Sequence, residues 1–427
     1  MLDIKFIRQN SDLVKKNAVN KGVKVDIDRL LELDEQRRKS QTRIDSLRAQ
    51  RRASSGSKPT PEEIDKLRKV GDEISKYEED LKKINREYDK LLKSVPNIAS
   101  SDTPVGPDES GNKVLRQWGK IPKFDFKPKE HHELGAALGL IDTAKAGEIS
   151  GSRFWYLKGD LVLMEFALIQ LAYSVLTSEK DLKKILAKAK IKLDSKPFTP
   201  VIPPVFIKPE IFAKMARLEP REERYHIPQD DLFLIGSAEH TLGPLHMNEI
   251  LKEEDLPVRY AGFSTAFRRE AGTYGKDMKG IFRGHQFDKL EMESFCLPED
   301  SVAEQNFMVA IQEHLMQVLE LPYQVVAICT GDMGGPDARQ IDLEAWMPGQ
   351  GKYRETHTAD LMTDYQARRL DTRVRRKSGS VEFVHMNDAT VFAGRPLIAI
   401  LENYQQPDGS VKVPKVLQKY LGKKLIR

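Results

Sequence analysis

The chain contains very little cysteine and has no long apolar run. Cys296 and Cys329 are its only cysteines, and neither is spaced as a metal ligand. This scarcity argues against a disulfide framework and favours a reducing compartment. Residues 1–16 lack the apolar core of a signal peptide, and no segment approaches the ~18 apolar residues of a membrane span. We therefore expect a soluble, cytoplasmic protein with no membrane partner.

A large excess of charge of one sign is also missing. The formal net charge is +5 over 427 residues, of which 31% are charged. Any polyanionic partner should therefore meet a local basic patch rather than a uniformly basic surface. With 40% hydrophobic residues, the chain is long enough for one large core and an accessory domain.

Residues 61–95 carry an apolar residue at every third or fourth position, with charge on most of the others. This narrow seam predicts a long helix. Residues 27–52 contain neither proline nor glycine and predict another helix, and the turn-forming residues 53–61 separate the two. We expect an antiparallel helical hairpin, a coiled-coil arm over about residues 27–95.

The first helix of this arm is strongly basic toward its end, where Asp45 is the single acid among many bases. The second helix is more balanced. A solvated coiled-coil face and a nucleic-acid-binding arm both fit such charges, but the unequal distribution favours contacts with phosphates. The side chains expected to make these contacts are Arg37, Arg38, Arg43, Arg48, Arg51 and Arg52.

Residues 95–111 are rich in proline, glycine, serine and aspartate, a composition typical of a linker. We therefore divide the chain into an N-terminal domain at residues 1–98, a linker at 99–115 and a larger domain at 116–427.

The run FRREAGTYGKDMKGIFRGHQFDKLE at residues 267–291 indicates a nucleotide site. Arg268 and Glu270 lie two apart, the period of a strand, so both should point to one face. Arg283, Phe287 and Glu291 share the same parity on a return strand. Arginine binds phosphate oxygens bidentately, and an aromatic face can stack on a purine. A charged surface hairpin is the alternative. The glycines that would allow the turn are Gly272, Gly275 and Gly280.

The order of residues in this run resembles the second signature motif of class II aminoacyl-tRNA synthetases, in the form found in seryl-tRNA synthetases. The linker SVPNIASSDTPVG and the segments KPKEHHELGAALGLID and GSRFWYLKGDLVLME also resemble that family, so the similarity covers nearly the whole chain. It implies an α+β fold, in which the helical hairpin is followed by a class II catalytic domain. That domain is built on a mostly antiparallel β-sheet flanked by helices.

Residues 198–212 are apolar and β-rich, but Pro203 and Pro204 place them at a sheet edge or an interface. This run resembles the first class II motif, which implies a homodimer. The apolar residues 154–176 provide surface to bury there. Within them Phe166, Leu168, Ile169 and Leu171 predict the core face of a long helix.

The resemblance implies a serine–tRNA ligase that activates L-serine with ATP to seryl-adenylate and transfers the seryl group to the 3′ end of tRNA(Ser). It leaves open whether tRNA(Sec) is a second substrate. A non-catalytic, synthetase-like RNA-binding paralogue and an amino acid:carrier-protein ligase are the alternatives. The intact set of charged residues argues against the former, and the basic arm argues against the latter.

The resemblance also implies the ATP-binding residues. Arg268 would clamp the α-phosphate and the substrate carboxylate, and Arg283 and Arg395 would hold the outer phosphates, so that Arg268 and Arg395 are the catalytic cations. Phe287 would stack on adenine, and Glu270 would accept from its amino group. Arg395 follows Gly394 at the predicted start of an apolar helix, which is a natural anion site.

Other site residues follow from the same resemblance. Ser237 and Glu239, in FLIGSAEH, would hold the amino end of serine, with Arg268 on its carboxylate. Glu355 and Thr358 fall where an acid and a hydroxyl would hold Mg²⁺, which prefers oxygen ligands. Outside this context a Glu-x-x-Thr pair is more typical of a helix surface.

The serine hydroxyl would meet Glu291 and a residue just before Arg395, where the chain departs from the family. The family usually has Asn-x-Ser or Asn-x-Thr, but this chain has Asn387-Asp388-Ala389-Thr390. If Thr390 supplies the hydroxyl, Asp388 replaces the asparagine and the chain is one residue short before Arg395. If Asn387 keeps its place, Ala389 lacks a hydroxyl. We favour Thr390.

Overall fold

A computed structural model describes residues 1–53, 60–270 and 279–427. The chain divides into two compact units, Met1–Ile98 and Ala99–Arg427. Two glycines of the predicted turn, Gly272 and Gly275, lie outside the described residues.

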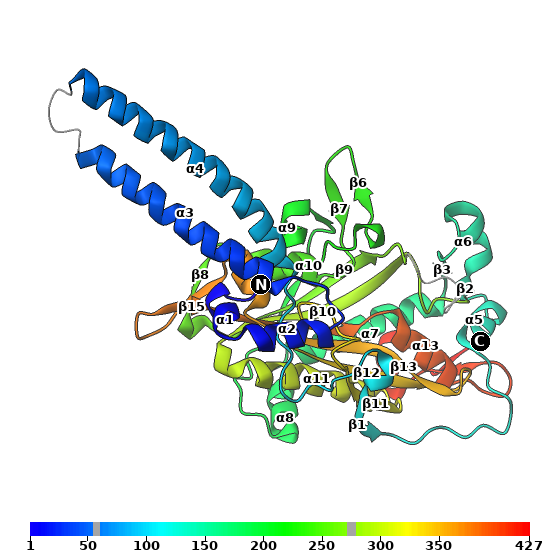
Figure 1. Ribbon diagram of the computed structural model, residues 1–427. Helices are drawn as coiled ribbons and strands as arrows, with labels where there is room; N and C mark the ends of the chain where they lie inside the picture. Colours follow the sequence, from blue (N-terminus) through cyan, green and yellow to red (C-terminus); the bar gives the residue numbers. More distant parts are fainter. Residues whose placement is uncertain (54–59, 271–278) are drawn as a thin grey trace. The chain divides into compact units, whose positions relative to one another are not determined.

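The N-terminal unit is helical. α1 (Ile4–Gln9) and α2 (Ser11–Asn20) precede the two long helices α3 (Ile27–Ala53) and α4 (Pro61–Ser94), which run side by side as an antiparallel hairpin (Figure 1). α4 begins with a capping box, because the Thr60 hydroxyl accepts from the Glu63 N–H and the Glu63 carboxylate accepts from the Thr60 N–H. Ile44 and Leu47 pack on Ile74 across the seam. The predicted coiled-coil arm is therefore confirmed.

An eight-stranded sheet forms the centre of the second unit, and all of its strand pairs are antiparallel except β4 with β9. Its strands in spatial order are β1 (Lys113–Trp118), β11 (Tyr323–Ala327), β12 (Arg339–Met347), β13 (Lys352–Thr363), β16 (His385–Phe392), β10 (Gln286–Cys296), β9 (Val258–Phe267) and β4 (Thr199–Val201). This confirms the predicted mostly antiparallel sheet. β1 begins at Lys113, so the last residues assigned to the linker belong to the sheet.

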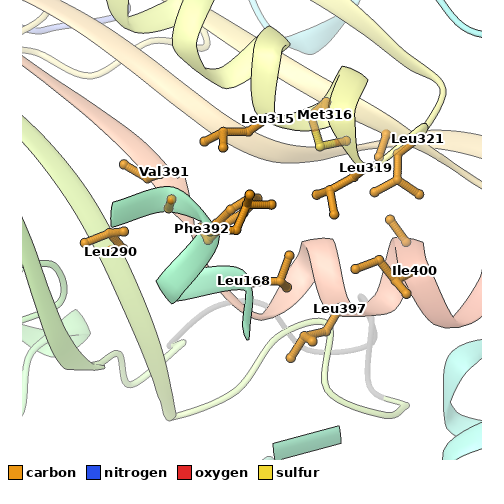
Figure 2. Packing of buried hydrophobic residues seen from close by; sticks show 14 of the residues in the cluster. Leu168, Leu290, Leu315, Met316, Leu319, Leu321, Val391, Phe392, Leu397 and Ile400 are labelled. Carbon is orange, nitrogen blue, oxygen red and sulfur yellow. The ribbon is translucent and has the colours of Figure 1, made fainter. Parts of the chain in front are cut away.

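Helices cover one face of this sheet. α7 (Asp160–Leu176), α11 (Ser301–Val318) and α13 (Gly394–Asn403) contribute to the main hydrophobic core together with inward-facing residues of the strands. Figure 2 shows Phe392 of β16 among Leu168 of α7, Leu315 of α11 and Leu397 of α13. Burying a side chain of this size contributes ~1.5–3 kcal/mol, so this face provides much of the unit's stability.

Smaller elements surround the sheet. The other helices are α5 (His131–Ala137), α6 (Thr143–Ser150), α8 (Glu179–Ala189), α9 (Pro209–Lys214), α10 (Glu239–Leu242), α12 (Tyr365–Leu370) and α14 (Gln418–Leu421). The short strands pair as β2 (Ile141–Asp142) with β3 (Tyr156–Leu157), β5 (Phe206–Ile207) and β6 (His226–Ile227) with β7 (Leu232–Leu234), β8 (Ile250–Lys252) and β15 (Val381–Phe383) with β14 (Arg373–Arg375), and β17 (Val411–Lys412) with β18 (Leu425–Ile426).

The edge prediction is confirmed, because β4, which ends two residues before Pro203, is the last strand of the sheet. The core prediction for α7 is wrong at one position. Leu168 is buried, but Phe166 is 57% exposed, because only one side of α7 faces the sheet. Within the described residues no single helix could cross a membrane by length and composition. α7 and α8 pass that test only as a pair bent by 79°.

Candidate active site

Strand parity creates a polar cavity on the sheet face opposite the helices. On β10, Leu290 and Met292 join the hydrophobic core, so Glu291 and Glu293 point to the other face. On β16, Ala389 and Val391 join the same core, so Asp388 and Thr390 point away from it. Several carboxylates consequently gather on one side of the central strands.

One cavity brings together every residue that was predicted to bind ATP, serine or Mg²⁺. Its lining includes Ser237, Glu239, Arg268, Glu270, Arg283, Phe287, Glu291, Glu355, Thr358, Thr390 and Arg395. Arg217, Lys289, Asp360 and Asp388 also line it. The sequence assigned no role to Arg217, Lys289 or Asp360, and Asp388 was considered only as the replacement for the family's asparagine.

The arginine-rich run does not form the predicted pair of strands throughout. β9 ends at Phe267 and β10 begins at Gln286, so Arg268, Glu270 and Arg283 lie in the connection between them. Glu270 has a φ of 50°, a left-handed conformation that a strand cannot contain. The two-residue spacing of Arg268 and Glu270 was therefore wrongly taken as strand parity.

Side-chain contacts still hold these loop residues at the cavity. Arg283 forms an ion pair with Glu270 at 2.9 Å. Arg268 Nε donates to the Gly236 carbonyl at 3.1 Å, and its guanidinium carbon lies 5.3 Å from the centre of the Phe287 ring, a cation–π distance. A phosphate-binding cation and a ring suited to stacking are thus adjacent.

Ser237 and Glu291 form the inner polar end of the cavity. The Ser237 hydroxyl donates to Glu291 Oε2 at 2.6 Å. Lys289 Nζ lies 2.5 Å from the same carboxylate oxygen and 3.2 Å from the Ser237 hydroxyl. Burial raises the pKa of Glu291, although Lys289 opposes that shift. Lys289 has the same strand parity as Glu291, which was a usable signal in the sequence.

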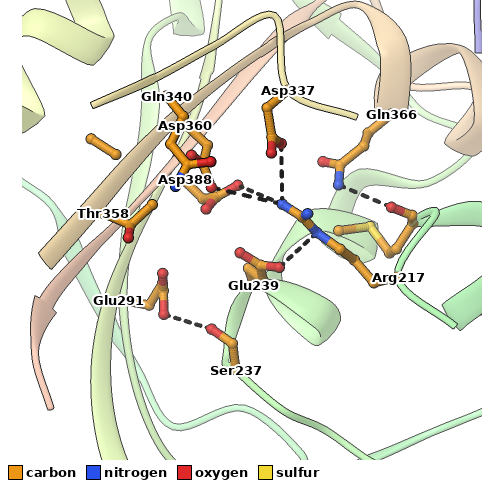
Figure 3. A network of polar contacts seen from close by, with 12 residues as sticks. Arg217, Ser237, Glu239, Glu291, Asp337, Gln340, Thr358, Asp360, Gln366 and Asp388 are labelled. Atoms are coloured by element: carbon orange, nitrogen blue, oxygen red, sulfur yellow. Dashed lines mark hydrogen bonds and ion pairs between the residues drawn. The ribbon is translucent and has the colours of Figure 1, made fainter. Parts of the chain in front are cut away.

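Arg217 lies beside Glu239 and was not predicted. It follows α9, and its Nε is 2.9 Å from Glu239 Oε1. Figure 3 shows its guanidinium between Glu239 and the carboxylates of Asp337, Asp360 and Asp388. No local sequence pattern marks Arg217, because its partners come from distant segments of the chain.

Charge keeps Glu239 ionised despite its burial. Desolvation alone would raise the pKa of this carboxyl, but Arg217 and His240 outweigh it and hold the pKa well below its usual value. His240 Nδ1 accepts the Gly236 N–H at 3.1 Å, which places the ring proton on Nε2, 3.3 Å from Glu239 Oε1. Burial lowers the pKa of His240 to about 4, so the ring donates as a neutral group.

A β-bulge explains how Glu355 and Thr358 share the cavity although they are three residues apart on strand β13. Leu343 of β12 pairs with His357, whereas the next residue, Glu344, pairs with Glu355. Thr356 is therefore an extra residue that shifts the parity by one. This strand geometry replaces the helix-surface alternative for the Glu-x-x-Thr pair.

Arg395 lies beside Glu355, at the end of the cavity where ATP is expected. Its NH1 is 2.9 Å from Glu355 Oε1, and its guanidinium carbon lies 4.6 Å from the centre of the Phe282 ring. Burial alone would raise the pKa of Glu355, but Arg395 lowers it below its usual value. An ionised carboxylate and a hydroxyl are ligands that suit Mg²⁺, so the residues fit this ion.

Asn387 and Thr390 lie on different faces of β16. Thr390 lines the cavity, whereas Asn387 is fully buried and its Nδ2 lies 3.6 Å from Cys296 Sγ. Gln312 of α11 donates to the carbonyls of Thr390 at 2.7 Å and Thr358 at 2.9 Å. Gln312 therefore holds the backbones of β13 and β16 in place from the face of the sheet that α11 covers.

The predicted arm arginines form many ion pairs within the N-terminal unit. Arg43 pairs with Glu73 and Arg48 with Glu78, each at 2.7 Å. Arg37 and Arg38 both contact Asp34, and Arg51 and Arg52 are exposed in the last turn of α3. Acids of α4 therefore neutralise part of the positive charge of α3, which the composition of α3 alone does not reveal.

Comparisons with known proteins define the class first. Residues 223–404 match the class II tRNA synthetase core domain (G, H, P, S and T), and residues 1–99 match the seryl-tRNA synthetase N-terminal domain. The fold and site are accordingly those of a class II aminoacyl-tRNA synthetase.

Full-length relatives define the family. The chain is 41% identical to a serine–tRNA ligase from Dictyoglomus turgidum, covering 100% of this chain and 99% of that one. The fold matches the crystal structure of a seryl-tRNA synthetase from Pyrococcus horikoshii complexed with ATP, with a TM-score of 0.89 and 38% identity. It also matches that of a cytoplasmic serine–tRNA ligase from Naegleria fowleri in complex with AMP, with a TM-score of 0.86 and 32% identity. Each match covers 100% of this chain and 99% of the other. The chain belongs to the seryl-tRNA synthetase family and is a serine–tRNA ligase.

Proposed function

We propose that the cavity activates L-serine with ATP and that the same enzyme then transfers the seryl group to tRNA(Ser). One observation carries this proposal: residues expected for ATP, for serine and for Mg²⁺ line a single cavity. Arg268 stands between the Phe287 ring and the segment that carries Ser237 and Glu239, so one cation can reach both an α-phosphate and an amino-acid carboxylate.

In the first step the serine carboxylate attacks the α-phosphorus of ATP, and the bond to pyrophosphate breaks. The second step transfers the acyl group to the terminal ribose of tRNA and releases AMP. Neither step requires a protein nucleophile, because positioning and charge neutralisation support this phosphoryl chemistry. Arg283 and Arg395 would stabilise the charge on the leaving pyrophosphate.

Glu355 and Thr358 would hold Mg²⁺. When bound, the ion would neutralise charge on the outer phosphates. Arg395 orients the Glu355 carboxylate through their 2.9 Å ion pair. At the other end, Glu239 would accept from the serine amino group, Glu291 and Thr390 would bond its hydroxyl, and Phe287 and Glu270 would bind adenine.

The N-terminal domain, residues 1–98, would bind tRNA through the arm at about residues 27–95, with the exposed Arg51 and Arg52 as its strongest candidates. A catalytic domain at residues 116–427 would follow the linker. tRNA(Sec) is a further candidate substrate. A homodimer would cover apolar side chains that are exposed in the single chain, among them Leu163, Phe166 and Ile202. A cytoplasmic location would accord with a reducing compartment for its two free cysteines.

ATP–pyrophosphate exchange tests the proposal. It should be measured with serine, threonine, alanine, glycine and cysteine, followed by aminoacylation of tRNA(Ser). We expect exchange with serine and charging of the tRNA. Exchange with none of the five would leave a non-catalytic RNA-binding paralogue, and exchange without tRNA charging would favour an amino acid:carrier-protein ligase.

A further inference from the structure

Arg217 is a buried cation shared by several carboxylates. Its side chain is 16% exposed, and it contacts Glu239 at 2.9 Å and Asp337 at 3.4 Å. Asp360 and Asp388 each lie 3.9 Å away. These four carboxylates are 10% exposed or less. One guanidinium cannot neutralise them all, and burial, reinforced by the neighbouring carboxylates, raises the pKa values of Asp360 and Asp388 well above their usual range. A further cation bound at this end of the cavity would favour the ionised forms of these two groups.

Three carboxylates converge on a single point. Glu239, Glu291 and Asp388 each offer an oxygen, and these three oxygens lie within 4.8 Å of one another. Their common centre is consequently no more than about 2.8 Å from each, the length of a charge-assisted N–H···O bond. An ammonium group at that centre could donate one hydrogen bond to every carboxylate.

Buried acceptors at the same place lack partners. Among the described residues, Asp360 Oδ1 and Glu293 Oε2 are buried and have no hydrogen-bond partner. Asp360 is 7% exposed and Glu293 is 1% exposed. A buried acceptor without a donor is costly. Asp360 lines the cavity, so its oxygen also favours a ligand that carries several N–H donors, whereas Glu293 lies behind the lining residues.

The backbone around Arg217 is held from both sides. Gln366 Nε2 donates to the Met215 carbonyl at 3.0 Å (Figure 3), and Arg224 Nε donates to the carbonyl of Arg217 at 2.9 Å. Ala216 has a φ of 57°, a left-handed conformation that turns the chain directly before Arg217. The guanidinium is therefore placed by its surroundings rather than free to follow the carboxylates.

We propose that Arg217 is a positioning residue of the serine site, which holds Glu239 and Asp388 so that they meet the α-ammonium of serine together with Glu291. Asp388 thereby becomes a specificity-determining residue that reads the amino group. The proposal deepens the proposed function and depends on it. Arg217 itself touches no reacting atom, so its removal should affect serine binding much more than ATP binding or the chemical step.

The test compares the KM for serine with the KM for ATP in pyrophosphate exchange by the full-length enzyme. Lysine keeps the charge at position 217 but has one nitrogen in place of a planar fork. For Arg217→Lys we expect the KM for serine to rise about tenfold or more, with kcat and the KM for ATP within about threefold of wild type.

Arg259→Lys is the matched control, because Arg259 is a fully buried arginine that pairs with Glu304 at 2.5 Å and does not line the cavity. It should lower the thermal midpoint and leave both KM values unchanged. If Arg217→Lys behaves in the same way, or raises the two KM values equally, Arg217 is merely structural and the proposal is wrong.

Asp337→Asn keeps the proposal testable even if Arg217→Lys does not fold. Asp337 contacts Arg217 but does not line the cavity. The weaker contact between the Asp337→Asn side chain and Arg217 should raise the KM for serine about threefold and leave the KM for ATP unchanged. An unchanged KM for serine would count against the proposal. Absence of serine-dependent exchange in the wild type would instead contradict the proposed function, and that result is seen before any variant is compared.

Discussion

Glu291 lies directly opposite Thr390 across the β10–β16 pair. Both residues point to the cavity, and their register brings a carboxylate and a hydroxyl to one place. This relationship supports Thr390 over Asn387 as the partner of the serine hydroxyl, since Asn387 lies on the other face of β16.

Thr390→Val should reduce the preference for serine over alanine. The variant keeps the side-chain shape but removes one of two groups that would bond the substrate hydroxyl. Sites built around such bonds discriminate by roughly 10⁴ to 10⁵ in total, so losing one bond should reduce the preference by about tenfold or more. The measurement is kcat/KM for both amino acids in pyrophosphate exchange. Asn387→Ala is the control, and a larger loss of preference in that variant would assign the hydroxyl contact to Asn387.

Arg395→Ala should reduce serine activation by roughly 10³-fold or more, because it removes charge stabilisation of the leaving pyrophosphate and comparable arginine contacts in phosphoryl transfer have that effect. The loss should be amplified because Glu355 also loses its ion-pair partner. Affinity for tRNA, measured by filter binding, should stay nearly constant. Arg116→Ala provides the control, since Arg116 forms its ion pair with Glu313 at 2.6 Å and does not line the cavity. A drop of less than about tenfold for Arg395→Ala would remove this arginine from the catalytic set.

Replacing residues 27–95 with a short linker should preserve adenylate formation and abolish transfer to tRNA. All proposed ATP and serine contacts come from residues of the second unit. Because contacts with the arm should be mostly to phosphates, the affinity of the intact enzyme for tRNA should fall steeply as salt increases.

Within the arm, Arg51→Glu, at an exposed position in the last turn of α3, should weaken tRNA binding more than Arg48→Glu, whose native arginine pairs with Glu78. Equal aminoacylation by the intact and the shortened enzyme would refute an RNA-binding role of the arm.

Glu165 should make stability depend on pH. Burial, reinforced by Asp288, raises the pKa of Glu165 to about 7 from its ordinary value of 4.5. The folded state therefore favours the protonated acid. Its contribution to the free energy of unfolding is fully present below pH 4.5 and is lost as the pH rises through about 7. The loss is at most ~3 kcal/mol, and less where water reaches the carboxyl.

The predicted pH dependence can be checked by measuring the free energy of unfolding of the wild type and of Glu165→Gln in denaturant at pH 5 and pH 8. The variant should gain stability relative to wild type at the higher pH, whereas the exposed control Glu148→Gln should show no such change. A constant difference between wild type and Glu165→Gln across this range would contradict the raised pKa.

Much of the fold was predictable because it depends on patterns that are local in the sequence. The apolar seam of residues 61–95 predicted α4, and Gly394 and Arg395 correctly marked the start of α13. Resemblance to the family supplied the mostly antiparallel sheet, which no local pattern contained. Phe166 was misassigned because the apolar character of a helix does not tell which side faces a sheet.

The candidate site was less predictable where backbone geometry departs from regular strands. Arg268 and Glu270 looked like strand neighbours, but the left-handed conformation of Glu270 ends that pattern. The extra residue Thr356 gives Glu355 and Thr358 a common face, and no residue type signals such a bulge. Arg217 was missed because its partners are brought to it by tertiary structure alone.

The five residues from Thr390 to Gly394 lead from strand β16 into helix α13 and then to Arg395. Upstream, the pairing of β16 with β10 sets the position of Thr390; downstream, the packing of α13 sets that of Arg395. Val391 and Phe392 belong to β16 and are buried in the core, so Ala393 alone lies between the strand and the helix. This one-residue junction fixes the spacing between the amino-acid end and the phosphate end of the cavity, because a lost or added residue in the strand would turn its side chains to the other face.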